Sequence, residues 1–240
     1  MNIYIYSSFK INSPIEILQW SIDRYTGSLF GQPDFTPTKL TESIAFEETL
    51  EALQILIENG KVRHVGISNE TPYGVCSMIA LAKSSPTLYP KIVSIQNSYS
   101  LVVRKDFEAG LAEACYHHNV GLLAYSPLAG GVLSGKYSQS IPQKARLLMF
   151  PGFMDRYLGS QNEAAVTAYN TIAKDIGLSP VQLALSWCYH REHVASTIIG
   201  ATTMTQLKEN IESYDIKLDE ETLTKIDKVY KQYTDPTKAY

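Results

Sequence analysis

The feature that most constrains the fold is a regular alternation, from residue 46 onward, between helical periodicity and short, fully apolar runs. Phe46, Leu50, Leu53 and Ile57 recur at the spacing of one helix face, and Gly60 follows where a helix C-cap would fall. Thr71 and Pro72 then suit the N-cap and first turn of a second helix. Such alternation is typical of βα units around a parallel sheet.

The apolar runs predict strands, and the periodic stretches between them predict helices. The strands are expected at residues 62–67, 91–95, 120–125 and 196–199, with a weaker candidate at 15–19. Further helices are expected at residues 107–115, 162–176, 180–190, 203–214 and 219–230, and an irregular segment at 128–161. The first three strands recur at intervals of roughly 30 residues, the size of one βαβ unit, which favours a barrel. A long loop inside a compact domain is usually functional.

The length of 240 residues suits one α/β barrel or two small domains. Hydrophobic residues make up 45% of the chain and charged residues 19%, which indicates a globular protein. No linker interrupts the pattern, so we expect a single domain over residues 1–240, in which residues 1–45 fit the repeat poorly.

The net charge of −3 provides no broad basic field for binding nucleic acid or an anionic membrane, so we expect neither partner. No apolar run reaches the roughly 18 residues that a membrane span needs. Cys76, Cys115 and Cys188 are odd in number and widely spaced, which indicates reduced packing residues rather than a disulfide framework. We therefore expect a cytoplasmic protein, although loss of an organellar leader stays open.

Each predicted strand ends in small polar residues. These are Ser68-Asn69, Gln96-Asn97, Tyr125-Ser126 and Gly200-Ala201-Thr202. In a parallel barrel such ends converge on one face, where active sites lie. Amide side chains can donate to and accept from a carboxamide, a Tyr ring can stack on a heterocycle, and a Gly-rich turn before a helix suits a phosphate.

Each strand end also has an ordinary structural interpretation. Ser68-Asn69 could supply only turn and capping chemistry, and Tyr125 could be a core residue. Gln96-Asn97 could cap a strand end, and Gly200 to Thr203 could be an ordinary connection with its N-cap. Their occurrence in order and at barrel spacing favours a dinucleotide pocket.

These segments resemble the aldo-keto reductase superfamily, especially the long-chain bacterial and plant branch that includes the potassium-channel beta subunits. The matching blocks are GKVRHVGISN at residues 60–69, IQNSYSL at 95–101, AYSPL at 124–128, GVLSGKY at 131–137 and IGAT at 199–202, with Gln206, Glu209 and Asn210. The resemblance covers about Glu47 to Thr234.

The resemblance implies the roles of individual residues in binding NADP(H). Ser68, Asn69 and Gln96 would hold the nicotinamide carboxamide, and Tyr125 would stack on the ring. The pyrophosphate would lie along Ser126, Leu128, Gly130 and Lys136. The adenosine end would lie on Gly200, Ala201, Thr202, Gln206 and Asn210, with Thr202 and Gln206 able to bond a 2′-phosphate and Lys208 the nearest cation. The expected reaction is hydride transfer to a small-molecule carbonyl, aldehyde or ketone.

The chain departs from the family at the catalytic tetrad of Asp, Tyr, Lys and His. The sequence around Leu18 to Tyr25 resembles the family's segment with an H-W-P motif, but Ser21 stands where the His is expected. The only Asp with a Tyr five residues later is Asp235, at the C-terminus, and no His precedes His64. We therefore expect no catalytic residue and no metal ligand in this chain.

The fold implied by the resemblance is an incomplete (β/α)8 TIM barrel, with about strands 4 to 8 and their helices. We expect an N-terminal truncation, a marginal isolated chain, and exposed edges that invite oligomerisation. The residues leave two alternatives to an impaired reductase open. One is a non-catalytic nucleotide-binding or regulatory subunit, and the other is a phosphate-binding barrel of another reaction class, favoured by Gly200 to Thr203 alone.

Overall fold

The computed structural model describes residues 15–20, as backbone, and residues 44–137 and 155–238. These residues form two compact units. The N-terminal unit holds residues 15–20, 44–97 and 107–123, and the C-terminal unit holds residues 98–106, 124–137 and 155–238.

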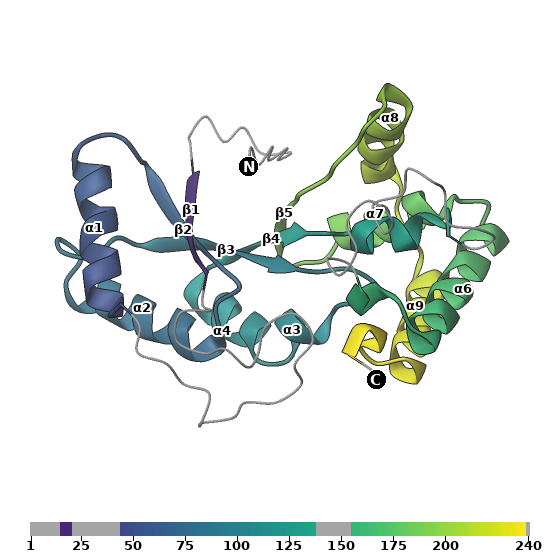
Figure 1. Ribbon diagram of the computed structural model, residues 1–240, viewed down its shortest axis with the longest axis horizontal. Coiled ribbons are helices and arrows are strands. Elements are labelled where there is room, and N and C mark those ends of the chain that lie inside the picture. Colours follow the sequence, from purple (N-terminus) through teal and green to yellow (C-terminus); the bar gives the residue numbers. More distant parts are fainter. Residues whose placement is uncertain (1–14, 21–43, 138–154, 239–240) are drawn as a thin grey trace. The chain divides into compact units, whose positions relative to one another are not determined.

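The N-terminal unit is built on parallel strands (Figure 1). β1 (Ile15–Trp20) pairs with β2 (His64–Ser68), and β2 pairs with β3 (Ile92–Ser98). The register places Ile17 opposite Gly66 and Ser68 opposite Gln96, so that β2 and β3 end side by side. β4 (Gly121–Tyr125) follows β3 in the strand order.

Helices connect these strands as the sequence predicts. α1 (Phe46–Glu58) ends at Asn59, and the left-handed Gly60 follows, with φ +67°. α2 (Pro72–Ser84) begins after Thr71, whose hydroxyl accepts a hydrogen bond from the Gly74 N–H at 3.2 Å. Figure 1 shows α2 and α4 (Leu111–His118) on the same side of the strands.

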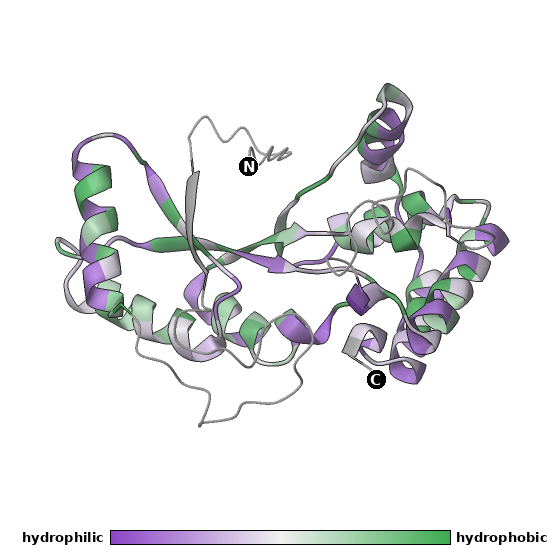
Figure 2. Cartoon of the chain, viewed as in Figure 1, coloured by the Kyte–Doolittle hydropathy of each residue, from purple (hydrophilic) through white to green (hydrophobic). Residues whose placement is uncertain are grey.

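The amphipathic pattern of α1 is visible along its length. Green and purple bands alternate on this helix in Figure 2, and Leu50 and Leu53 on its apolar side are buried. Burying a Leu side chain stabilises a fold by about 1.5–3 kcal/mol. The two buried Leu residues therefore hold α1 on the rest of the N-terminal unit.

The C-terminal unit begins with the loop 98–106 and the end of β4. β5 (Val194–Thr197) lies in the same unit. Directly after β5, the Ile198 N–H donates a hydrogen bond to the Ala124 carbonyl of β4. Around them lie three 3-10 turns, η3 (Ala129–Ser134), η4 (Asp155–Tyr157) and η5 (Ser213–Asp215), and four α-helices. The helices are α6 (Ser160–Asp175), α7 (Pro180–Tyr189), α8 (Met204–Glu212) and α9 (Glu220–Gln232), followed by η6 (Pro236–Lys238). Their core contains the fully buried Trp187, Tyr99 and Leu133.

Three predictions of secondary structure need correction. The helix expected at residues 107–115 is divided, because Gly110 with φ +93° separates α3 (Lys105–Glu108) from α4. The last strand starts two residues early, at Val194, directly after a turn closed by its N–H on the Arg191 carbonyl. The segment expected to be irregular contains η3 and η4, while residues 138–154 lie outside the described part.

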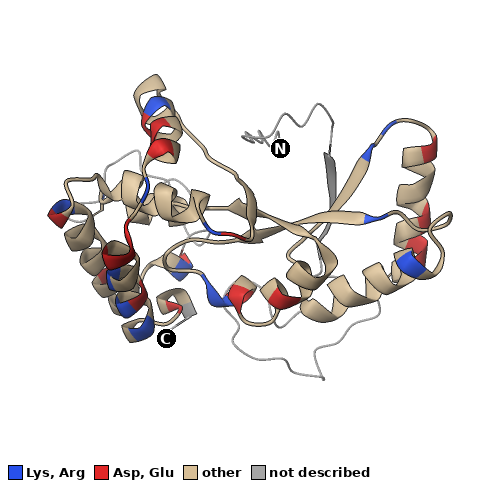
Figure 3. Cartoon of the chain, turned by 180° about the vertical axis from the view of Figure 1, so that it is seen from behind, with Lys and Arg blue, Asp and Glu red and all other residues tan. Residues whose placement is uncertain are grey.

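Other predictions can be placed on the described residues. β1 confirms the weaker candidate strand at residues 15–19. Acidic and basic residues, coloured red and blue in Figure 3, are interspersed along α9. None of the described helices combines the length and the apolar character that crossing a membrane requires.

Candidate functional site

The first group of predicted site residues lies at the ends of β2 and β3, in the N-terminal unit. The Asn69 N–H donates to the Gln96 carbonyl at 3.0 Å and to Asn97 Oδ1 at 3.1 Å. Ser68 Oγ donates to the same Gln96 carbonyl at 3.1 Å and accepts from Asn69 Nδ2 at 3.2 Å. The structure therefore brings Ser68, Asn69 and Gln96 together, and their binding of a carboxamide stays a prediction.

The backbone of Asn69 is left-handed, with φ +52°. Asn tolerates this conformation better than most residues with a Cβ, and it reverses the chain direction between β2 and α2. Glu70 follows, 3% exposed, and its Oε1 accepts from the Thr71 N–H at 2.7 Å and from Thr71 Oγ1 at 3.1 Å. No sequence motif marks Glu70, whereas Asn97 makes the strand-end contact that one interpretation of Gln96-Asn97 predicted.

The side-chain amide of Gln96 carries a buried hydrogen-bond donor at the end of β3. Gln96 is 9% exposed, and its buried Nε2 has no hydrogen-bond partner among the described residues. A buried donor without a partner costs about 1–3 kcal/mol, so proteins rarely retain one without a reason. The carbonyl oxygen of a bound carboxamide would satisfy this donor.

The second group begins with Tyr125, the last residue of β4, in the C-terminal unit. Its carbonyl accepts a hydrogen bond from the Tyr99 N–H at 3.1 Å. Burial raises the pKa of the Tyr125 phenol to about 12, against the opposing effect of the Arg156 guanidinium. The phenol is therefore neutral at physiological pH, and a neutral ring suits stacking on a heterocycle.

Arg156 and Tyr157 in η4 were not predicted as site residues. Arg156 Nη2 donates to the Tyr157 hydroxyl at 2.8 Å, its guanidinium lies 4.8 Å from the centre of that ring, and it also bonds the Tyr125 side chain. No motif in the sequence marks this contact, because η4 follows a long segment with no distinctive pattern. Within η4 the sequence offers only the triplet Asp-Arg-Tyr, which does not by itself indicate a contact with Tyr125.

The backbone after Tyr125 is unusually rich in left-handed residues. Ser126, Ala129, Gly130 and Gly131 have φ values of +54°, +48°, +67° and +98°. These residues close a tight turn in which the Ala129 N–H donates to the Ser126 carbonyl at 2.8 Å. Leu128 lies within the same turn, and its carbonyl accepts from the N–H groups of Gly131 at 2.8 Å and Leu133 at 3.2 Å.

Lys136 is folded back onto this turn. A Cβ at Gly131 would come within 2.7 Å of Lys136 Nζ, so the absence of a side chain at Gly131 makes room for the ammonium group. The ammonium also lies 5.0 Å from the centre of the Tyr137 ring. A cation beside a left-handed turn is chemically suited to a pyrophosphate, which fits the predicted roles of Ser126, Leu128, Gly130 and Lys136.

The predicted adenosine site surrounds the start of α8. Thr203 caps this helix by accepting from the Gln206 N–H at 3.2 Å. Gln206 Oε1 in turn accepts from the Thr202 N–H at 2.8 Å and from Thr202 Oγ1 at 3.0 Å. These contacts bring Thr202 and Gln206 together beside Gly200 and Ala201. Among the described residues, none except the chain neighbours of Gly200 has a heavy atom within 4 Å of its Cβ position.

Asn210 and Glu209, on the last turns of α8, make further contacts around this turn. Asn210 is 2% exposed and donates from Nδ2 to the Gly200 carbonyl at 3.2 Å. Glu209 Oε1 accepts from Ser179 Oγ at 2.6 Å, which links α8 to the N-cap of α7. Asn210 therefore holds the backbone of Gly200, and direct contact with an adenosine stays a prediction.

Ser68, Asn69 and Gln96 belong to the N-terminal unit, and the ten other predicted residues belong to the C-terminal unit. That the two groups meet around one nucleotide stays a prediction.

Three of the described His residues contact other protein groups. His118 Nδ1 lies 3.3 Å from Lys83 Nζ, and His190 Nε2 lies 2.9 Å from the Tyr214 carbonyl. His193 contacts the edge of the Tyr99 ring. Over residues 44–137 and 155–238 no group of three or more metal-ligating side chains is close enough to hold one ion.

Comparison with known proteins identifies the class. The family model of the aldo/keto reductases matches residues 19–231. The chain is 44% identical over 208 residues to protein tas of Escherichia coli (strain K12), covering 86% of this chain and 59% of that protein. It is 33% identical over 183 residues to the E. coli (strain K12) L-glyceraldehyde 3-phosphate reductase, covering 75% of this chain and 52% of that protein.

A third relative is a putative voltage-gated potassium channel subunit beta of Schizosaccharomyces pombe (strain 972 / ATCC 24843). It is 31% identical over 193 residues, covering 78% of this chain and 56% of that protein. This chain belongs to the aldo/keto reductase family, which confirms the resemblance and the α/β barrel fold class. The parallel sheet is consistent with part of such a barrel, and the chain spans between 52% and 59% of the length of these relatives.

Proposed function

We propose that this chain binds NADP(H) and forms the nucleotide-binding part of an oxidoreductase that reduces small aldehydes or ketones to alcohols. Members of the aldo/keto reductase family generally use NAD(P)H, and the relatives include a reductase of a phosphorylated aldehyde. The nicotinamide cofactor, when bound, supplies the hydride. The residues of this chain bind it, orient it and exclude water.

The observation that carries the proposal is the buried Nε2 of Gln96, which has no partner among the described residues. In the proposed complex this amide and the side chains of Ser68 and Asn69 hold the carboxamide. The neutral ring of Tyr125 stacks on the nicotinamide, and Lys136 neutralises the pyrophosphate. Thr202 and Gln206 favour the 2′-phosphate of NADP(H), a preference that rests on their hydrogen-bonding capacity.

The direct test is titration of the 240-residue chain with NADPH. Binding is monitored by protein fluorescence and by the melting temperature. Binding should quench Trp or Tyr emission and raise the melting temperature by mass action. A parallel titration with NADH measures the preference for the 2′-phosphate. Unchanged fluorescence and melting with both nucleotides would refute the proposal.

A second candidate function is a nucleotide-binding or regulatory subunit without efficient turnover. It is favoured by Ser21, which stands where the family's H-W-P motif has its His. Reduction of a carbonyl needs a proton donor beside the hydride. NADPH binding without oxidation of NADPH across a panel of aldehydes would select this candidate over the reductase.

A further inference from the structure

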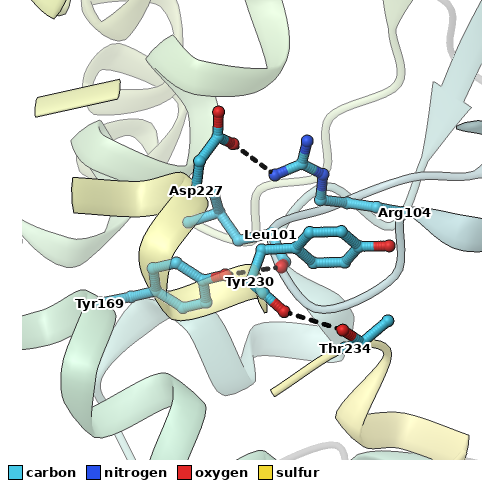
Figure 4. A network of polar contacts seen from close by, with 6 residues as sticks. All are labelled: Leu101, Arg104, Tyr169, Asp227, Tyr230 and Thr234. Carbon is cyan, nitrogen blue, oxygen red and sulfur yellow. Dashed lines mark hydrogen bonds and ion pairs between the residues drawn. The ribbon is translucent and has the colours of Figure 1, made fainter. Parts of the chain in front are cut away.

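Arg104 connects the loop after β3 to the C-terminal helix. Its side chain is almost fully buried, and Nη1 donates to Asp227 Oδ1 on α9 at 2.8 Å (Figure 4). The guanidinium also lies 4.1 Å from the centre of the Tyr230 ring, one helical turn further along α9. A buried charge persists only where it is paired, and α9 provides both the carboxylate and an aromatic face.

A second carboxylate from the C-terminus holds the backbone of the same loop. Asp235 Oδ1 accepts hydrogen bonds from the Arg104 N–H at 3.0 Å and from the Lys105 N–H at 3.2 Å. Asp235 is 3% exposed, and its φ of +44° is a strained conformation for a residue with a Cβ. Arg104, Asp227, Tyr230 and Asp235 are called the C-terminal clasp below.

The loop between Ser98 and Asp106 extends this contact to the candidate site. The Arg104 guanidinium lies 5.2 Å from the centre of the Trp187 ring, and Trp187 stacks on Tyr99 with ring centroids 5.2 Å apart. The N–H of Tyr99 donates to the carbonyl of Tyr125. At the middle of the loop, Tyr169 Oη donates to the Leu101 carbonyl at 3.1 Å (Figure 4).

This arrangement joins Tyr125 to α9 through the buried rings of Tyr99 and Trp187 and the buried side chain of Arg104. Tyr99 and Trp187 are 0% and 1% exposed, so neither ring can shift without displacing the other. Loss of the Asp227 pair would leave a buried guanidinium without its carboxylate, which favours release of the whole loop. Release of the loop would remove the N–H that holds the Tyr125 carbonyl.

We propose that the C-terminal clasp positions Tyr125 for a bound nucleotide, with Arg104 as the positioning residue. The inference rests on the proposed function, because Tyr125 is the residue assigned to the nicotinamide. Linkage makes the effect reciprocal: a clasp that favours nucleotide binding is itself tightened by the nucleotide. The C-terminal helix thereby contributes to cofactor affinity without touching the cofactor.

The test combines cofactor affinity with amide hydrogen exchange of residues 99–106 in the full chain. NADPH should slow exchange of this peptide in the wild type, because the Tyr99, Arg104 and Lys105 N–H groups are the donors of the clasped loop. In Arg104→Met the exchange should be fast with or without NADPH, and the Kd for NADPH should rise roughly fivefold or more.

Arg191→Met is the matched control. Its guanidinium lies 5.3 Å from the same Trp187 ring, compared with 5.2 Å for Arg104, so the variant removes a cation from the same ring. Arg191→Met should keep the Kd within about twofold of the wild type and retain the slowing of exchange by NADPH. Asp227→Asn provides a second variant, since this carboxylate is half-exposed and its loss leaves the apolar packing intact.

The outcomes separate this inference from the proposed function. If the wild type binds NADPH, and both Arg104→Met and Asp227→Asn bind it equally well, the clasp does not position Tyr125. If Arg104→Met does not fold, Asp227→Asn decides by the same two measurements. If the wild type does not bind NADPH, the proposed function fails, and the positioning role fails with it.

Discussion

The ammonium group of Lys136 occupies the space beside Gly131 that a side chain would fill, with Nζ 2.7 Å from the position of a Cβ. Because Gly131 also has φ +98°, the turn depends on glycine both for its backbone and for the placement of the cation. This relationship makes the proposed pyrophosphate site testable by a single methyl group.

Gly131→Ala should displace Lys136 and weaken NADPH binding. The backbone cost of a left-handed Ala is about 1–2 kcal/mol, and the added Cβ forces the flexible ammonium away from the turn. Gly177→Ala is the control, because Gly177 has φ +72° and, over the part of the chain that the structure describes, no heavy atom beyond its chain neighbours lies within 4 Å of its Cβ position. Both variants should melt at lower temperature, but only Gly131→Ala should raise the Kd, and equal affinities would contradict the role of Lys136.

Lys136→Met tests the charge itself. A charge-assisted hydrogen bond contributes about 1.5–3 kcal/mol, so its loss should raise the Kd for NADPH roughly tenfold or more. The salt dependence of binding should also weaken, because one cation no longer takes part. Lys225→Met, which removes an exposed partner of Glu221 on α9, should change neither quantity. Affinity and salt dependence of Lys136→Met that match the wild type would place the pyrophosphate elsewhere.

Gln96→Met should separate stability from binding. The buried Nε2 has no partner among the described residues, so replacing the amide by a thioether of similar size removes an unsatisfied donor. We expect the free energy of unfolding without ligand to be unchanged or higher, while the affinity for NADPH falls. Ser94→Ala removes another buried group that lacks a described partner, two residues earlier on β3, and should leave the affinity unchanged. A Gln96→Met variant that binds NADPH like the wild type would remove the main support for the carboxamide site.

The parts of the fold that follow from local patterns were predictable from the sequence. Thr71-Pro72 marks the start of α2 and Gly60 follows the end of α1, because capping depends on residues within one turn. The ends of β2 and β3 were predictable for a similar reason, since Ser68 and Gln96 follow apolar runs of strand length.

Contacts between distant residues were not predictable in the same way. Asp235 matched the family's Asp and Tyr spacing only by chance, and the structure gives it a different role, bonded to the backbone of Arg104 and Lys105. Similarly, Arg156 reaches Tyr125 from η4, a turn that no sequence motif marks. Such contacts depend on tertiary packing, which leaves no periodic signal in the sequence.

The three cysteines provide a last prediction, on thiol reactivity and alkaline stability. Cys76 is exposed, whereas Cys115 and Cys188 are buried, and burial raises the pKa of both buried thiols from 9.0 to about 12. A thiol-specific chromogenic reagent at neutral pH should therefore react rapidly with Cys76 alone, and a Cys76→Ser variant should react only after unfolding in guanidinium chloride.

The same burial fixes the sign of the pH dependence of stability. Below about pH 9 the two thiols are protonated in both states, and the full stability is present. Between about pH 9 and 12 the unfolded chain has lost these protons and the folded chain retains them, so the free energy of unfolding must decrease with pH. Urea denaturation should show a smaller decrease over this range for Cys188→Ala than for the wild type. An equal decrease would show that the Cys188 thiol does not titrate differently in the two states.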